Sequence, residues 1–289
     1  MKLIVGCGFL GSRVARLWLQ RGCQVAAVTR SRQRAELLAA DGLEPVVADV
    51  TEPATLRLLP AAETVLWAVG WTQETSVSRQ ALYVDGLRNV LQSLDVPPHR
   101  LIFISSTGVY GQAGGECVDE DSPTSPTRES GKALLDAEQV LASHPLGRRA
   151  IVLRMAGLYG PGRLLRTDEL LAGRPLTVPS GRKLNLIHVD DAASAVLAAE
   201  ARAEPPARYL VSDGCPVDRR EYFRCVAELI GAPPPRFVEP DRDQLSRSHG
   251  ASDKRVSNDR MLRDLKVNLL YPNYRTGLGA ILGGQVGQR

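Results

Sequence analysis

The chain has 289 residues, of which 44% are hydrophobic, and its 36 basic and 32 acidic side chains give a net charge of +4. This length and apolar content allow one large domain or two smaller domains with real cores. The basic residues are scattered along the chain, which argues against nucleic-acid binding. No apolar run reaches the roughly 18 residues of a membrane span. An odd number of cysteines without metal spacing, and no secretory signal before the first strand, indicate a cytoplasmic protein.

Short apolar segments alternate with segments of helical periodicity through most of the chain. This alternation predicts βαβ units, and therefore a doubly wound α/β fold around a parallel sheet that is covered on both faces. The predicted strands are 3–5, 24–30, 44–50, 64–70, 100–111, 150–160 and 208–213, of which the fifth and sixth run into turns. The predicted helices are 10–21, 32–42, 82–94, 128–143, 188–200 and 218–231.

A glycine-rich turn directly follows the first predicted strand. Gly6, Gly8 and Gly11 have the spacing G-x-G-x-x-G, and Phe9 and Leu10 lie within the turn. In this pattern the first glycine allows a tight turn, the second lets a pyrophosphate approach the backbone, and the third lets the helix pack on the strand. The N-terminus of the helix offers unpaired N–H groups to an anion. We therefore expect this turn to bind the diphosphate of a dinucleotide.

The ends of the second and third predicted strands bear on the choice of cofactor. An acidic residue after the second strand would bind the ribose 2′-hydroxyl of NAD, but none precedes Glu36. Arg30 and Arg32 suit the 2′-phosphate of NADP, so we expect NADP, with NAD as the alternative. Asp49 and Val50 end the third strand. Asp49 either accepts a hydrogen bond from the adenine amino group or caps the following segment.

Taken together, these motifs resemble the extended short-chain dehydrogenase/reductase superfamily, of the NAD-dependent epimerase/dehydratase type, over nearly the whole chain. The resemblance implies a Rossmann core over 1–156, completed by about 187–213, and a smaller substrate lobe built from 157–186 and 214–289. It also implies that Ala68, Val69 and Gly70 run beneath the cofactor. The segments that carry it are GCGFLG (6–11), ADVTEP (48–53), WAVG (67–70), VDGLRNVL (84–91), ISSTGVYG (104–111), LRMAGLYGPGR (153–163), IHVDDAA (187–193), SDKRVSN (252–258) and YPNYRTGL (271–278).

The same resemblance implies that a Ser or Thr, a Tyr and a Lys perform the proton transfer. Ser106 matches the catalytic hydroxyl, and Thr107 is the neighbouring candidate. Lys132 matches the lysine, whose side chain meets the nicotinamide ribose. Arg128 stands four positions earlier, where the tyrosine is expected.

Arg128 cannot do the work of a phenol, because a guanidinium has a pKa above 12 and no acceptor atom. Tyr110, Tyr159 or a water held by Ser106 could supply the proton instead. A further interpretation is that Arg128 and Lys132 together bind an anionic group of the substrate.

Two functions therefore remain open at this point. The first is an NAD(P)-dependent oxidoreductase, epimerase or dehydratase that acts on a sugar nucleotide or a small polar carbonyl compound. The second is a catalytically silent NADP(H)-binding or redox-sensing protein. We expect a small-molecule substrate, no nucleic-acid or membrane partner and no metal site, and we leave a homodimer open.

Overall fold

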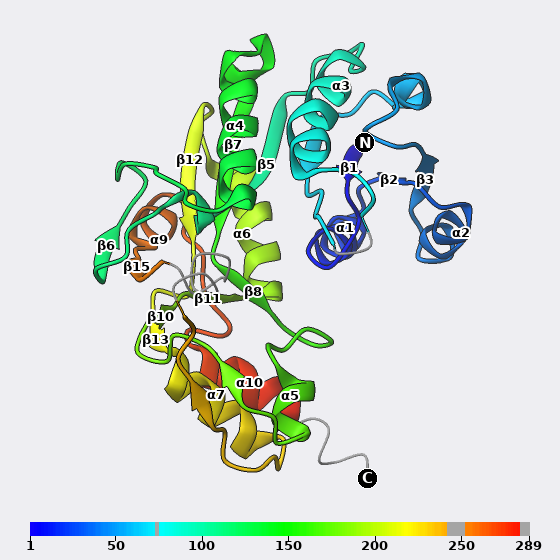
Figure 1. Cartoon of the computed structure of the whole chain (residues 1–289). Coiled ribbons are helices and arrows are strands. Elements are labelled where there is room, and N and C mark those ends of the chain that lie inside the picture. The colour runs from blue at the N-terminus through cyan, green and yellow to red at the C-terminus, as the bar shows by residue number, and fades with distance from the viewer. Residues whose placement is uncertain (73–74, 242–251, 284–289) are drawn as a thin grey trace.

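A seven-stranded parallel sheet forms the centre of the molecule. The computed structural model describes residues 1–72, 75–241 and 252–283. The strand order is β12-β7-β5-β4-β1-β2-β3 (Figure 1). The order reverses between β1 and β4, which is where ligands bind in open α/β sheets. The strands are β1 (Lys2–Val5), β2 (Val25–Thr29), β3 (Glu44–Val47), β4 (Thr64–Trp67), β5 (Arg100–Ser106), β7 (Ala150–Met155) and β12 (Ala207–Val211).

Helices cover both faces of this sheet. Successive residues of a strand point to opposite faces, so Leu3 and Val5 of β1 join one apolar cluster while Ile4 joins the other. The helices packed on the face of Ile4 are α1 (Gly11–Gln20), α6 (Val189–Arg202) and α9 (Asp259–Leu265), with α2 (Arg32–Ala40) beside them. The opposite face carries a π-helical turn (Ala81–Asp85) that leads into α3 (Gly86–Gln92), together with α4 (Glu129–Ser143).

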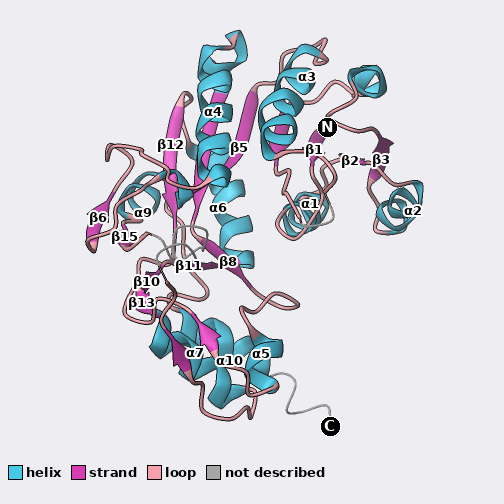
Figure 2. Ribbon diagram, in the orientation of Figure 1, coloured by secondary structure: helices cyan, strands magenta, loops and turns pink. Residues whose placement is uncertain are grey.

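A smaller lobe lies beyond the carboxyl ends of β5, β7 and β12 (Figure 2). It has an apolar cluster of its own, which includes Leu170, Tyr222, Phe223 and Leu278. Its helices are α5 (Thr167–Leu171), α7 (Arg219–Leu229) and α10 (Tyr274–Gly283). Its short strands pair as β9 (Leu176–Thr177) with β14 (Phe237–Val238) and as β10 (Lys183–Leu184) with β13 (Val217–Asp218).

Two further strand pairs lie near the boundary between the sheet and the lobe. They are β8 (Gly157–Tyr159) with β11 (Leu186–His188), and β6 (Glu116–Val118) with β15 (Lys254–Val256). Three 3-10 turns, η1 (Pro53–Leu58), η3 (Thr107–Val109) and η4 (Pro145–Arg149), complete the described elements. After β15 the chain returns to the sheet, where Met261 and Leu265 of α9 are fully buried in the main core.

The expected doubly wound parallel sheet is confirmed by the strand order. Helix α9 packs on the sheet, although we placed its residues in the lobe. Residues 242–251 and 284–289 of that predicted lobe lie outside the described residues. Within the described ranges, no helix combines the length and the apolar character that crossing a bilayer would require.

Candidate active site and cofactor cavity

One large cavity runs along the carboxyl edge of the sheet and reaches into the smaller lobe. Its volume is about 1070 Å³, which is at the upper end of the range for small-molecule sites. Its wall includes the glycine turn, the ends of β2, β4 and β5, the first turns of α4, and residues of β9, β10, α7 and β15. The sheet's reversal point and the lobe therefore share one continuous space.

The glycine turn has the backbone that a dinucleotide needs. Gly6 has a φ of +98°, and a Cβ there would lie 2.6 Å from the backbone of Ala68. A Cβ at Gly8 would meet nothing within 4 Å, so this position is open towards the cavity. Gly11 does not line the cavity, but a Cβ there would strike the carbonyl oxygen of Gly6. The three glycines thus allow the turn, the approach of a ligand and the close packing of α1 respectively.

Basic residues lie in the cavity wall where β2 ends. Arg30 lines the cavity, whereas Arg32 lies outside the wall. Arg34, which we did not single out from the sequence, takes its place. Ser31 caps α2 by accepting a hydrogen bond from the backbone N–H of Arg34 at 3.3 Å, and this cap fixes which helical positions turn towards the cavity.

Asp49 acts locally rather than on the cavity. Its Oδ1 accepts hydrogen bonds from the backbone N–H of Thr51 at 2.8 Å and from the Thr51 hydroxyl at 2.7 Å. Its Oδ2 lies 4.0 Å from Arg30. Val50 lines the cavity and Asp49 does not. The N-cap residue of η1 is Glu52, so Asp49 does not cap this helical turn. An adenine contact of Asp49 stays a prediction.

The segment expected beneath the cofactor, which we call the floor, and the expected catalytic hydroxyl group both lie in the cavity wall. Ala68, Val69 and Gly70 follow β4 and line the cavity, as do Ser106 and Thr107. Ser106 Oγ accepts a hydrogen bond from the backbone N–H of Gly108 at 3.0 Å. This bond orients the hydroxyl and leaves its own proton available to a ligand.

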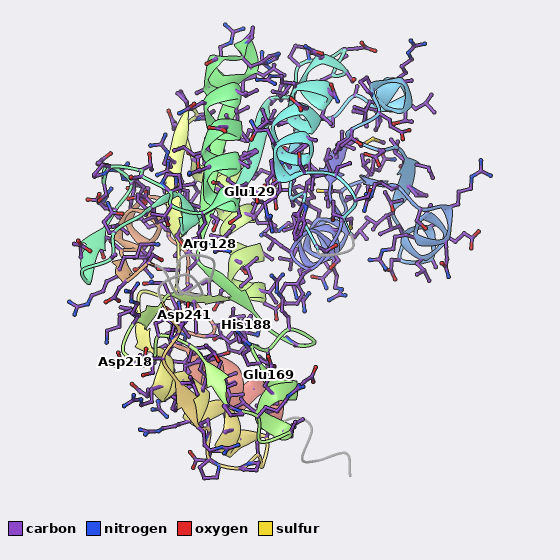
Figure 3. All side chains as sticks on the ribbon, in the orientation of Figure 1. Arg128, Glu129, Glu169, His188, Asp218 and Asp241 are labelled. Atoms are coloured by element: carbon purple, nitrogen blue, oxygen red, sulfur yellow. The ribbon has the colours of Figure 1, made fainter. Side chains whose placement is uncertain are left out.

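Helix α4, on which the resemblance places the tyrosine and the lysine, has a different pair of residues facing the cavity. Arg128 is the N-cap residue of α4, lines the cavity and lies at the end of the helix that faces the lobe (Figure 3). Ser130 and Leu134, four residues apart, also line the cavity. Lys132 is exposed and does not line it, which contradicts the expectation that its amine contacts the cofactor.

A buried ion pair fixes the rotation of α4. Glu138 and Arg154 are 5% and 2% exposed, and their ion pair measures 2.6 Å. Glu138 also accepts a hydrogen bond from the hydroxyl of Ser105 at 2.6 Å. Leu134 and Ser130 lie four and eight residues before Glu138, on the same side of the helix. The pair thus directs these two residues towards the end of β5.

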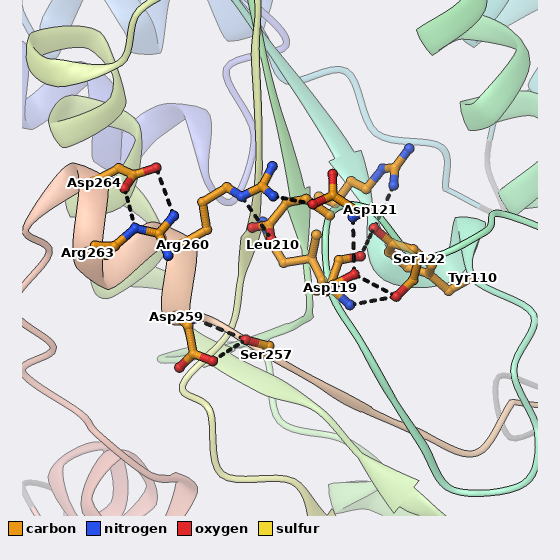
Figure 4. A network of polar contacts seen from close by, with 12 residues as sticks. Tyr110, Asp119, Asp121, Ser122, Leu210, Ser257, Asp259, Arg260, Arg263 and Asp264 are labelled. Carbon is orange, nitrogen blue, oxygen red and sulfur yellow. Dashed lines mark hydrogen bonds and ion pairs between the residues drawn. The ribbon is translucent and has the colours of Figure 1, made fainter.

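Tyr110 and Tyr159 do not supply a free phenol. The Tyr110 hydroxyl accepts from Arg154 at 2.6 Å and donates to the carbonyl oxygen of Asp119 at 2.8 Å, within the network of Figure 4. Tyr159 is fully buried outside the cavity wall, against His188 and Gly277. Burial raises the pKa of Tyr159 far above its usual value. The structure thus contradicts our candidate Tyr159 as a proton donor to the cavity.

Comparison with known proteins identifies the family to which this chain belongs. The model of the NAD dependent epimerase/dehydratase family matches residues 3–212. The chain belongs to the NAD-dependent epimerase/dehydratase family. It is 28% identical to Protein YeeZ of Escherichia coli (strain K12), over 93% of this chain and 96% of that protein.

Two further similar proteins match nearly the whole length of this chain. A 3-diazoavenalumate denitrifying reductase from Streptomyces sp is 26% identical, over 96% of this chain and 98% of the reductase. The solved structure of a functionally unknown conserved protein from Silicibacter pomeroyi DSS superimposes with a TM-score of 0.81 at 29% identity, over 98% of each chain.

The residues present fit the nicotinamide dinucleotide of this family. The glycine turn leaves the room that a diphosphate needs, and Ala68, Val69 and Gly70 line the same cavity. No cluster of metal-ligating side chains occurs in the described part of the chain.

The charged side chains in the described part of the cavity wall are all basic. No aspartate or glutamate is among the described residues that form it. Burial, with a smaller effect of neighbouring cations, lowers the pKa of Arg219 to about 10 and that of Lys254 to about 8. The basic residues of the wall are Arg30, Arg34, Arg128, Arg163, Arg166, Lys183, Arg219 and Lys254.

Proposed function

We infer that this protein is an NADP(H)-dependent oxidoreductase or epimerase that acts on an anionic, polar carbonyl compound. The observation that supports this most directly is the large cavity along the carboxyl edge of the sheet, whose described wall carries eight basic side chains and no carboxylate. Cations without carboxylates favour phosphate or carboxylate groups in the ligand. A sugar nucleotide and a small keto acid both belong to this class of substrate.

Arg30 and Arg34 are the residues that we assign to the 2′-phosphate of NADP. Both line the cavity at the end of β2, where the adenosine ribose binds in this fold. A hydrogen bond to a charged group contributes roughly 1.5–3 kcal/mol. Arg34→Ala should therefore weaken NADPH binding about tenfold or more and leave NADH binding unchanged.

Arg32→Ala is the matched control for this assignment, because Arg32 is on the same helix and is exposed like Arg34 but lies outside the cavity wall. Titration calorimetry with NADPH and with NADH measures both affinities. Equal losses for the two cofactors in Arg34→Ala, or an equal loss in Arg32→Ala, would refute the assignment.

The chain's own residues bind and orient the two reactants. The nicotinamide ring supplies or accepts a hydride when the cofactor is bound. Gly6 and Gly8 accommodate the diphosphate, and Ser106 donates a hydrogen bond to the substrate oxygen. Arg128 and Arg219 attract the anionic part of the substrate at the lobe end of the cavity.

The proposed active site is altered relative to the pattern that the resemblance implies. The two cavity-facing residues of α4 that are four apart are Ser130 and Leu134, which provide neither a phenol nor an amine. A positioned acid contributes ~10²–10⁴-fold in rate, so turnover requires a donor from elsewhere in the wall.

A carbonyl screen in the presence of NADPH tests the proposed activity. The screen pairs each anionic ketone or aldehyde with its neutral ester, and it includes nucleoside diphosphate sugars. We expect NADPH oxidation with anionic members and at least tenfold lower kcat/KM with the esters. A preference for the esters would contradict the charge argument.

The catalytically silent NADP(H)-binding protein remains the second candidate, and the pair Ser130 and Leu134 is the observation that favours it. Ser130→Tyr combined with Leu134→Lys places a phenol and an amine on the cavity side of α4. If this variant oxidises NADPH with carbonyl compounds that the parent does not use, the result supports a catalytically silent wild-type protein. A cytoplasmic location and a homodimer remain predictions from the sequence, and fractionation and sedimentation test them.

A further inference from the structure

The proposed reduction needs a proton donor that α4 does not provide. Among the described residues, two tyrosines, Tyr83 and Tyr110, contribute to the cavity wall. The Tyr110 hydroxyl is held between Arg154 and Asp119. The Tyr83 hydroxyl accepts the backbone N–H of Trp71 at 2.9 Å, directly after the floor residue Gly70. Burial raises the pKa of both phenols.

Lys254 brings an amine into the same cavity from a distant part of the chain. Its side chain lines the cavity and is only 5% exposed. Its Nζ donates to the carbonyl oxygen of Tyr110 and to Ser252 Oγ, both at 3.0 Å. An ammonium group has three N–H bonds, so one remains for a ligand. Both acceptors are uncharged, and no ion pair joins Lys254 to a carboxylate in the described ranges.

The surroundings of Lys254 allow its proton to leave near neutral pH. Burial is the largest cause that lowers its pKa to about 8, and Arg219 and Arg128 add to this effect. The charged groups next to Lys254 have other partners and do not offset this lowering of its pKa. These are Glu116 of β6, which accepts the Gly114 N–H, Lys183 of β10, which pairs with Asp218 at 3.2 Å, and Asp253, which accepts the Lys183 N–H.

We propose that Lys254 is the catalytic residue that donates the proton to the carbonyl oxygen during reduction. The assignment rests on the proposed oxidoreductase function. The carbonyl carbon gains a hydride from the reduced cofactor, and the π electrons of the C=O bond move to oxygen. The oxygen takes a proton from Lys254 as its N–H bond breaks. The neutral amine then regains a proton from water, and the reverse reaction uses Lys254 as the base.

The kinetic test uses NADPH and 4-carboxybenzaldehyde, an anionic aldehyde, as the probe. Lys254→Met should lower kcat by ~10²-fold or more with KM within a few-fold, because a positioned acid contributes ~10²–10⁴-fold. Lys254→Arg keeps the charge but cannot release a proton, so it should keep KM and lose kcat. Wild-type kcat for reduction should fall above about pH 8, where Lys254 is deprotonated, and Lys254→Met should lack this fall.

Arg255→Met is the matched control, because Arg255 follows Lys254 on the same strand and is exposed. Its kcat should equal that of the wild type. Full activity in Lys254→Arg would show that only the charge matters and would overturn the proposal. Loss of kcat in Tyr83→Phe, with Lys254→Met active, would transfer the role to Tyr83.

A labelling experiment tests the assignment of Lys254 without requiring turnover. Pyridoxal 5′-phosphate, also an anionic aldehyde, should form an imine with Lys254 in the wild-type protein, which borohydride traps and peptide mass spectrometry locates. Labelling should rise towards about pH 8, with the pKa of Lys254. Absence of label at Lys254 would refute the proposal. NADPH binding without oxidation by any carbonyl compound, with Lys254 still labelled, would instead count against the proposed function.

Discussion

Asp213 should make the protein less stable as the pH rises from about 4 to about 7. Its side chain is 5% exposed at the end of β12, where Oδ1 accepts the Cys215 N–H at 2.9 Å. Oδ2 is buried without a hydrogen-bond partner among the described residues. Burial is the main cause that raises the pKa of Asp213 from 3.8 to about 7, and Asp191 adds to it.

The sign and size of the effect follow from proton linkage. Between about pH 4 and 7 the folded protein binds a proton that the unfolded chain has lost, so the free energy of unfolding falls as the pH rises. The difference between the two pKa values corresponds to at most about 4 kcal/mol. Asp213→Asn removes the ionisation and keeps the acceptor for Cys215. It should match the wild type at about pH 4 and exceed it by about 2–4 kcal/mol at pH 8.

Urea unfolding of both proteins across this pH range measures the difference directly. Asp95→Asn is the control, because Asp95 is exposed and should change the free energy of unfolding by less than about 0.5 kcal/mol. If Asp213→Asn is equally or less stable than the wild type at pH 8, the carboxylate is solvated or paired in solution, and the linkage argument fails.

The remaining predictions concern the glycine turn and the buried ion pair. Gly6→Ala meets the backbone of Ala68 at a positive φ, so it should both destabilise the fold and abolish NADPH binding. Gly8→Ala meets no neighbour, so thermal melting should be unchanged while calorimetry shows weaker NADPH binding. Glu138→Gln leaves Arg154 as a buried unpaired charge, which should cost about 3–5 kcal/mol in urea unfolding; a smaller cost than about 1 kcal/mol would contradict this estimate.

The sheet and the glycine turn could be predicted from the sequence because local signals determine them. Apolar runs of strand length, each followed by a helical pattern, leave few alternatives to a parallel sheet. The roles of Gly6 and Gly11 depend only on the backbone around the turn, and the structure shows both.

The helical faces at the site could not be predicted in the same way. One residue along a helix rotates a side chain by about 100°, so Lys132 and Leu134 lie on nearly opposite faces. Glu138, an acid among apolar residues of the helix, was the available signal for the correct face. Arg32 and Arg34 show the same effect, because the position of the Ser31 cap decides which of them lines the cavity.

Lys254 and Tyr159 depended on tertiary structure. Lys254 reaches the cavity because β15 pairs with β6, more than 130 residues earlier in the chain. The local sequence around Lys254 carries no sign of that pairing. We expected Tyr159 in a loop near the cofactor, but it ends β8, helix α10 packs against it, and a Cβ at Gly277 would strike its hydroxyl group.

The return of α9 to the sheet determines what a shortened gene would produce. Met261 and Leu265 come late in the chain but fill the main core beside α6 and β12. A stop codon placed at the end of β12 would therefore remove part of the interior of the nucleotide-binding half as well as the lobe. We expect such a product to be recovered as an aggregate, and the two halves cannot be expressed as separate consecutive fragments.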